Sequence, residues 1–86
     1  MRLLWEESAW SDYCYWQTQD KKTLKRINIL IKDILRNPFE GKGKPEALKG
    51  NLSGMWSRRI DDTNRIMYCV QDEVVIIGAC KGHYDN

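Results

Sequence analysis

The chain has 86 residues, of which 14 are Lys or Arg and 12 are Asp or Glu, for a formal net charge of +2. A chain of this length forms one domain with a single modest core. Acidic residues follow the first five positions, and no apolar run is long enough to cross a bilayer, so neither a secretory signal nor a membrane span is expected. The three cysteines have no CxxC spacing and share the chain with one histidine, which indicates reduced thiols of a cytosolic protein rather than a zinc site.

Charge is distributed unevenly along the chain. Residues 1–20 carry one basic and four acidic side chains, residues 21–65 carry twelve and five, and residues 66–86 carry one and three. The middle segment therefore has a net charge of +7 between two negative ends, as a phosphate-binding surface would produce. A solvated helix followed by a lysine-rich loop explains the same pattern.

The first expected elements are a short strand over Arg2–Trp5 and a helix that opens at residues 6–8. Glutamates at its start suit the positive end of the helix dipole. One face of this helix carries four residues at helical spacing: Trp10, Tyr13, Cys14 and Gln17. Its aromatic residues, with Trp16, are expected in the core rather than on a base-stacking surface.

A second helix is expected after a break at residues 18–20, and it ends near Arg36 because the residue before Pro38 avoids the helical region. Apolar side chains recur along it at helical spacing: Leu24, Ile27, Ile31, Ile34 and Leu35. Its basic residues lie mostly outside that apolar stripe, which predicts an amphipathic helix.

Residues 38–50 predict a shaped loop, since glycines and prolines alternate with lysines between the apolar residues Phe39 and Leu48. Three strands are expected after it, over residues 55–60, 65–70 and 74–80. Short turns separate these strands and predict an antiparallel meander. Two helices followed by a meander predict an α+β fold with the helices on one face of the sheet.

Some of the side chains suit metal-independent cleavage of RNA. That reaction needs a base for the ribose 2′-hydroxyl, a cation for the phosphate, and an acid for the leaving 5′-oxygen. The chain offers one carboxylate inside its basic loop, Glu46, and one imidazole, His83. Its guanidinium candidates are Arg58, Arg59 and Arg65.

Each candidate also has a structural interpretation. His83 can be an exposed surface residue, Glu46 can pair with a neighbouring lysine, and Arg65 can neutralise the aspartates of the preceding turn. Arg58 and Arg59 are adjacent in a strand, so only one of them can share a face with the site, and the other is expected to cover a sheet edge or bind a partner. Composition and spacing therefore indicate a basic α+β domain that could bind RNA.

The residue string is more specific. Its informative stretches are Trp10-Ser11-Asp12-Tyr13, Tyr15-Trp16-Gln17, residues 38–46, residues 52–60, Asn64-Arg65 and His83-Tyr84. Together they resemble the YoeB/Txe toxins of bacterial toxin–antitoxin modules, which belong to the RelE-like, ribosome-dependent mRNA interferases. The resemblance implies one toxin domain over residues 1–86, with two N-terminal helices packed on a twisted, mainly antiparallel sheet of about five strands.

The resemblance also implies an activity: cleavage of mRNA in the ribosomal A site to a 2′,3′-cyclic phosphate and a 5′-hydroxyl, without a metal or cofactor. Position by position, it implies Glu46 as the general base, His83 as the general acid and Arg65 as the cation that stabilises the phosphate. The residues expected to hold the RNA are Lys44, Lys49, Arg59 and Tyr84.

The implied partners are a cognate antitoxin of the YefM/Axe type, whose C-terminal segment wraps the toxin, and the 70S ribosome with its mRNA. Operator DNA is expected to be bound only through the toxin–antitoxin complex. The toxin is expected in the bacterial cytoplasm as a homodimer or a hetero-oligomer, with no membrane contact. The alternatives are a non-catalytic ribosome or RNA binder and a protein-interaction module, each using the same basic surface.

Two features depart from the family pattern. Gly82 stands where a bulkier, often aromatic residue is expected, so a looser approach to His83 is predicted. Asp85 and Asn86 extend beyond the usual His-Tyr end and add a negative charge beside the site. Reduced or retuned activity is the most that these departures predict, because the base, the arginine and the acid are all present.

Overall fold

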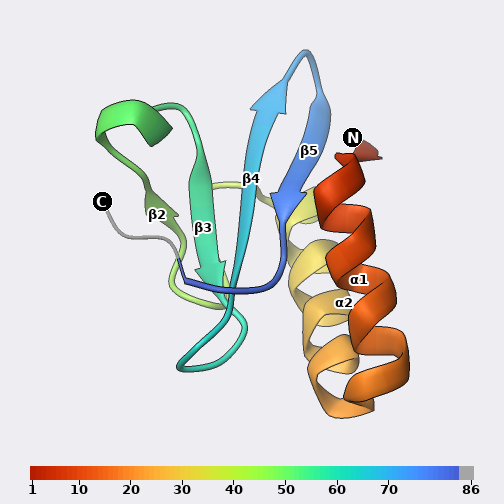
Figure 1. Cartoon of the computed structure of the whole chain (residues 1–86). Coiled ribbons are helices and arrows are strands. Elements are labelled where there is room, and N and C mark those ends of the chain that lie inside the picture. The colour runs from red at the N-terminus through yellow and green to blue at the C-terminus, as the bar shows by residue number, and fades with distance from the viewer. Residues whose placement is uncertain (84–86) are drawn as a thin grey trace.

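The computed structural model describes residues 1–83, which form two helices on a five-stranded sheet. Helices α1 (Glu7–Gln19) and α2 (Lys21–Arg36) lie side by side on one face of the sheet (Figure 1). The strands are β1 (Arg2–Trp5), β2 (Glu46–Ala47), β3 (Trp56–Arg59), β4 (Arg65–Gln71) and β5 (Val74–Ala79). A single turn of 3-10 helix, Gly50–Leu52, connects β2 to β3. The predicted α+β architecture is confirmed.

The sheet has the strand order β1-β5-β4-β3-β2. Strands β3, β4 and β5 form the predicted antiparallel meander, and β1 runs parallel to β5 at the edge. The sequence predicts loop throughout residues 38–50, but Glu46 and Ala47 pair with β3 as an added edge strand. A two-residue strand is too short to show the alternation by which strands are predicted, so this prediction was wrong.

The two helices are joined at Asp20, which ends α1 and caps α2. Its backbone is extended, and its carboxylate accepts the N–H groups of Lys22 and Thr23, each at 3.1 Å. Such a cap satisfies donors that the first turn of a helix leaves unpaired. Asp20 therefore sets the tight reversal that places both helices on the same face. Within the described residues, neither helix is long and apolar enough to cross a membrane.

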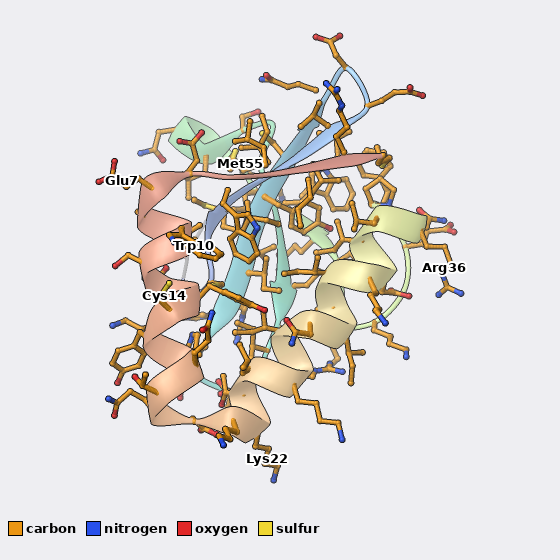
Figure 2. The ribbon with its side chains drawn as sticks, turned by 90° about the vertical axis from the view of Figure 1, so that its right-hand side faces the viewer. Glu7, Trp10, Cys14, Lys22, Arg36 and Met55 are labelled. Atoms are coloured by element: carbon orange, nitrogen blue, oxygen red, sulfur yellow. The ribbon has the colours of Figure 1, made fainter. Side chains whose placement is uncertain are left out.

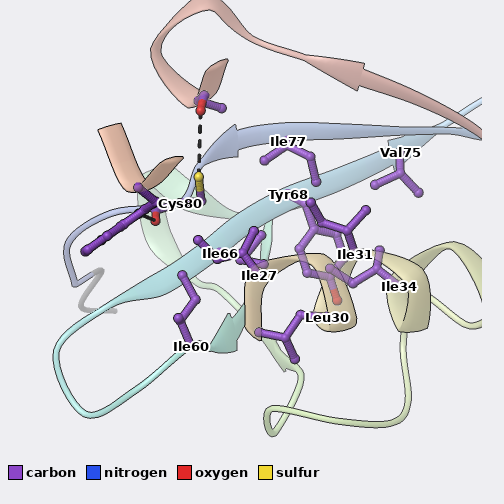
Figure 3. Close-up of a cluster of buried hydrophobic side chains, with 12 residues drawn as sticks. Ile27, Leu30, Ile31, Ile34, Ile60, Ile66, Tyr68, Val75, Ile77 and Cys80 are labelled. Atoms are coloured by element: carbon purple, nitrogen blue, oxygen red, sulfur yellow. Dashed lines mark hydrogen bonds between the residues drawn. The ribbon is translucent and has the colours of Figure 1, made fainter. Parts of the chain in front are cut away.

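The core lies between α2 and the middle of the sheet (Figure 3). The side chains that meet there include Ile27, Leu30, Ile31 and Ile34 of α2 and Ile66, Tyr68, Val75 and Ile77 of β4 and β5. The alternation of buried residues along β4 and β5 directs one face of the sheet toward the helices. Neither helix covers the opposite face, termed the open face, although some of its side chains, such as Ser57 and Arg65, are buried.

The expectation that Trp10 belongs to the core was wrong, because 49% of this residue is exposed. Helix α1 buries only Ala9 and Trp16, because only a narrow face of it packs against β5 and the edge strand β1. Trp10 instead joins Trp5 and Tyr13 in an aromatic cluster whose ring centroids lie 4.8–5.8 Å apart. Figure 2 shows α1 and α2 from the side, with Cys14, Lys22 and Arg36 on their outer surfaces.

Candidate active site

The open face of the sheet carries three of the predicted site residues. Glu46 lies opposite Ser57 across the β2–β3 pair, and Arg59 lies opposite Arg65 across the β3–β4 pair. Directly opposed residues share a face, as do residues two apart in one strand. Glu46, Arg59 and Arg65 therefore all lie on the face away from the helices.

These side chains differ in exposure. Glu46 and Arg59 are exposed, whereas Arg65 is only 9% exposed. Glu46 and Arg65 are two strands and two residues apart, or roughly 12 Å between Cα atoms by ordinary strand spacing. The side chains of Glu46 and Arg65 must both extend toward the space between them for the carboxylate and the guanidinium to contact one ligand.

The turn over residues 61–64 fixes Arg65 at the start of β4. The Asp61 carboxylate accepts the N–H groups of Thr63 at 2.8 Å and Asn64 at 2.6 Å. Partial burial alone would raise the pKa of Asp61, but these bonds and the nearby Arg65 charge lower it below its ordinary value. Arg65 Nη1 donates to the carbonyls of Asp61 at 2.6 Å and Asn64 at 3.1 Å. Among residues 1–83, the guanidinium is thus held by backbone carbonyls rather than by a carboxylate.

The chain after β5 returns to this turn. Gly82 donates its N–H to Asn64 Oδ1 at 2.9 Å and accepts the N–H of Arg65 at 2.8 Å. In Figure 1 this segment, in dark blue, passes the lower end of β4 toward β3 and β2. His83 follows directly and is exposed, so the imidazole is carried by a segment bonded to the first residue of β4. Tyr84 and the two residues after it lie outside the described residues.

The backbone of Gly82 is fixed in place, whereas the looser approach to His83 predicted from this glycine stays a prediction. Both backbone polar groups of Gly82 are hydrogen-bonded. The φ angle of Gly82 is +96°, in a region that favours glycine over residues with a side chain. An added Cβ at this position would meet no described atom within 4 Å, so glycine is favoured here by its φ angle and not by crowding against β4.

The predicted lysines lie on either side of Glu46. Lys44 is exposed and has a φ angle of +53°, and Lys49 is exposed just before the 3-10 turn. Among residues 1–83, no three His, Cys, Asp or Glu side chains lie close enough together to hold a metal ion. The open face therefore offers a carboxylate and two guanidinium groups to a ligand, with exposed lysines in the flanking loops and an imidazole on the adjoining segment.

Comparison with known proteins identifies the family. The sequence model for the YoeB-like toxin of bacterial type II toxin–antitoxin systems matches residues 5–84. The chain belongs to this family. It is 58% identical to the toxin YoeB of Escherichia coli strain K12, over 98% of this chain and all of that protein. It is 52% identical to the toxin YoeB of Synechocystis over the full length of both.

Solved structures agree with this assignment to the YoeB-like toxins. A YoeB/ParE toxin from Agrobacterium tumefaciens has a TM-score of 0.95 and 43% identity, with 98% of this chain and all of that chain covered. The YoeB of a heterotetrameric YoeB–YefM complex from Staphylococcus aureus has a TM-score of 0.89 and 47% identity, with 98% of each chain covered. YafQ from E. coli, at 14% identity and a TM-score of 0.80, shows the shared fold alone.

Among the guanidinium candidates of this toxin, Arg58 was placed wrongly by sequence reasoning. It was expected to cover a sheet edge or bind a partner, but it is fully buried on the helix face, opposite Ile66 of β4. Its guanidinium binds the Asp33 carboxylate at 2.6 Å and the Tyr68 hydroxyl at 3.1 Å. It also donates to three backbone carbonyl groups of the loop between α2 and β2: those of Asn37, Glu40 and Lys42. Asp33 inside the apolar stripe of α2 was the available signal, since a buried acid needs a partner.

This buried ion pair shapes the loop that leads to Glu46. The backbone N–H of Lys42 acts against the effect of burial and, with the Arg36 and Arg58 guanidinium groups, lowers the pKa of Asp33 to about 2. At Gly41, an added Cβ would lie 2.1 Å from Asp33 Oδ2, so the loop passes too close to the ion pair for a side chain. The shaped loop predicted from its glycines is thus built around Asp33 and Arg58.

Helix α1 holds the segment between β5 and His83, which sequence reasoning also missed. Ser8 Oγ donates to the carbonyl of Gly78 at 3.1 Å, and Asp12 Oδ2 accepts the N–H of Cys80 at 3.0 Å. Trp16 Nε1 donates to the carbonyl of Cys80 at 2.9 Å. These contacts join residues 64–70 positions apart, and no local pattern in the sequence indicates them.

Proposed function

We propose that this YoeB-like toxin is an endoribonuclease that cleaves mRNA in the A site of translating ribosomes, with Glu46, Arg65 and His83 acting on one phosphodiester. The main support is the bonding of Gly82 to Arg65, which brings the segment carrying His83 to the strand that carries the cation. A second support is the strand register, which puts Glu46, the proposed base, on the same open face as Arg65.

The chemistry follows from these three side chains. Glu46 takes the proton of the ribose 2′-hydroxyl, and the 2′-oxygen forms a bond to phosphorus. The bond from phosphorus to the 5′-oxygen breaks, and His83 gives its proton to that oxygen. The products are a 2′,3′-cyclic phosphate and a 5′-hydroxyl. Arg65 stabilises the charge on the crowded phosphate; its hydrogen bonds within residues 1–83 use only Nη1, so that Nε and Nη2 keep donors for two phosphate oxygens.

Other basic residues hold the RNA around this centre. Arg59 lies beside Arg65 and adds positive charge at the same phosphate or the next one. Lys44 and Lys49 are exposed on either side of Glu46 and bind the backbone electrostatically. Tyr84, directly after His83, stacks on or orients a base of the codon.

The exposure of the site explains why a ribosome is required. Glu46 and His83 are both exposed, so this chain alone neither excludes water nor fixes the attacking 2′-hydroxyl in line with the bond that breaks. Positioning of that kind supplies much of the rate of such reactions. We therefore expect weak cleavage of free RNA and strong cleavage of translated mRNA. Equal rates on the two substrates would contradict ribosome dependence.

The expected protein partner is a cognate antitoxin, as in the YoeB–YefM complexes of S. aureus. A net charge of +7 over residues 21–65 suits an acidic segment wrapped on the toxin. Operator DNA is then bound through the antitoxin of that complex. A homodimer of the free toxin has a counterpart in the YoeB dimer of S. aureus, which has 47% identity and a TM-score of 0.90. The bacterial cytoplasm, where mRNA is translated, is the expected location.

The test compares the wild type with Glu46→Gln and His83→Gln on ribosomes programmed with a defined mRNA. Loss of a general base or acid is expected to slow cleavage by about 10²- to 10⁴-fold while ribosome binding persists. Lys25→Ala, which removes an exposed charge from α2, is the matched control and keeps the wild-type rate. A non-catalytic RNA binder or a protein-interaction module would produce no cleavage that depends on Glu46 or His83.

A further inference from the structure

We infer that Asn64 is a positioning residue that holds the segment carrying His83 against the strand that begins with Arg65. The inference rests on the proposed roles of His83 and Arg65 and adds how their relative position is kept. The turn over residues 61–64 and the chain after β5 meet at the lower end of the sheet in Figure 1.

The segment that carries His83 follows the last strand of the sheet. Strand β5 ends at Ala79, and residues 80–83 belong to no helix or strand. Gly82 bonds this segment to the start of β4: it donates to the Asn64 side chain at 2.9 Å and accepts from the Arg65 backbone at 2.8 Å. The preceding Lys81 places its ammonium 4.0 Å from the centre of the Tyr15 ring on α1. His83 directly follows Gly82, so a shift of Gly82 moves the imidazole directly.

The Asn64 amide is itself held in one orientation. Its Nδ2 lies 3.2 Å from each carboxylate oxygen of Asp61, which identifies this atom as the donor and leaves Oδ1 to accept from Gly82. Partial burial would raise the pKa of the Asp61 carboxylate, but hydrogen bonds to it, including those from Asn64, lower this pKa, and the charge of this acceptor strengthens those bonds. The hydrogen bonds therefore run in series from Asp61 to the Asn64 side chain and from there to Gly82.

The main chain of the same turn aims the cation. The carbonyls of Asp61 and Asn64 both accept from Arg65 Nη1. Asn64 thus serves two groups in different ways, His83 through its side chain and Arg65 through its carbonyl. A side-chain substitution keeps the carbonyls that hold Arg65 and removes the bonds of the Asn64 amide to Gly82 and Asp61. Its effect on cleavage is therefore expected to act mainly through the segment that carries His83.

The experiment compares Asn64→Ala with Thr63→Ala, which changes the same turn but keeps the backbone N–H that Thr63 gives to Asp61. Amide exchange of Gly82 is measured relative to that of Cys69 within β4, together with kcat and KM on programmed ribosomes. Asn64→Ala is expected to speed Gly82 exchange about tenfold and to lower kcat about 10- to 100-fold with KM nearly unchanged, as a small misplacement of a catalytic group does. Thr63→Ala is expected to keep all three values.

A second pair of variants distinguishes a loss of the contact from a loss of folding in Asn64→Ala. Asn64→Asp keeps an acceptor for Gly82 but places two carboxylates together at Asp61, so kcat should fall. In the double variant Asp61→Asn, Asn64→Asp, the amide at position 61 donates to the carboxylate at position 64, the reverse of the wild type. This variant is expected to recover most of the lost kcat.

Faster Gly82 exchange in Asn64→Ala with an unchanged kcat would overturn the inference, as would no recovery in the double variant. A wild-type toxin that cleaves no mRNA on ribosomes would overturn the proposed function and this role of Asn64 together. An active wild type in which Asn64 has no effect on kcat would overturn the positioning role alone.

Discussion

Arg58 and Arg59 are neighbours of the same residue type, and they have opposite surroundings. Arg58 faces the helices, is fully buried, and gives all its hydrogen bonds to Asp33, Tyr68 and loop carbonyls. Arg59 faces away from the helices, is exposed, and lies opposite Arg65. The pleat of β3 therefore makes one arginine part of the structure and leaves the other available to a ligand.

The same contrast holds for the two faces of the whole sheet. The helix face holds the apolar core and one buried ion pair that shapes the loop before β2. The open face displays Glu46, Arg59 and Arg65 on strands whose positions the other face fixes. Substitutions on the helix face should chiefly change stability, and those on the open face should chiefly change cleavage.

Arg58→Ala is expected to have the largest effect on stability. It removes the buried partner of the Asp33 carboxylate and leaves it only Arg36, whose side chain is largely exposed, and the N–H of Lys42. Breaking a buried pair in this way costs about 3–5 kcal/mol. Arg59→Ala is expected to change the free energy of unfolding by about 0.5 kcal/mol or less. Urea unfolding of the two variants measures both values. Equal losses in the two would refute the assignment of Arg58 to the structure and Arg59 to the site.

Arg59→Ala is expected instead to impair cleavage. Loss of one guanidinium at the phosphate should lower kcat/KM on programmed ribosomes about 10- to 100-fold, and it should make ribosome binding less dependent on salt. The control is Lys25→Ala, which removes a positive charge from the other side of the molecule. If both variants lower kcat/KM equally, Arg59 acts only through the net charge of the toxin.

Much of the helix face could be predicted from the sequence, and less of the open face. The apolar stripe of α2 and the turns between β3, β4 and β5 are local patterns, and the structure confirms them. The Asp33–Arg58 pair was missed because it joins residues 25 positions apart. The approach of Gly82 to Arg65 depends on the path of the chain after β5, which no local pattern describes. The roles of Glu46, Arg65 and His83 came from the family resemblance and stay predictions.

Acid unfolding tests whether the ionised form of Asp33 stabilises the folded chain. Its pKa in the folded chain is about 2, lowered from 3.8, so its contribution is fully present above about pH 4 and is lost as the pH falls toward 2. At 1.36 kcal/mol per unit, this contribution is about 2 kcal/mol. Asp33→Asn should be less stable than the wild type at pH 6, and its Tm should fall less between pH 5 and 2. Parallel falls in Tm would show that Asp33 is not stabilised in its ionised form.

The smallest loss of stability predicted for the helix face lies in its apolar part. Ile27 is fully buried between α2 and the sheet, and Ile27→Val removes one methylene group at a cost of about 1 kcal/mol. Its kcat on programmed ribosomes should match the wild-type value at a temperature where both are folded. A large loss of kcat would mean that the two faces are not separable in the way proposed.

The most direct measurement of the central claim is mapping of mRNA ends on ribosomes programmed with a defined message. The account predicts that wild-type toxin produces new 2′,3′-cyclic phosphate and 5′-hydroxyl ends at the A-site codon. It also predicts that Glu46→Gln and His83→Gln bind the same ribosomes and produce almost none. Ends with a 3′-hydroxyl and a 5′-phosphate, or wild-type cleavage by both variants, would contradict it.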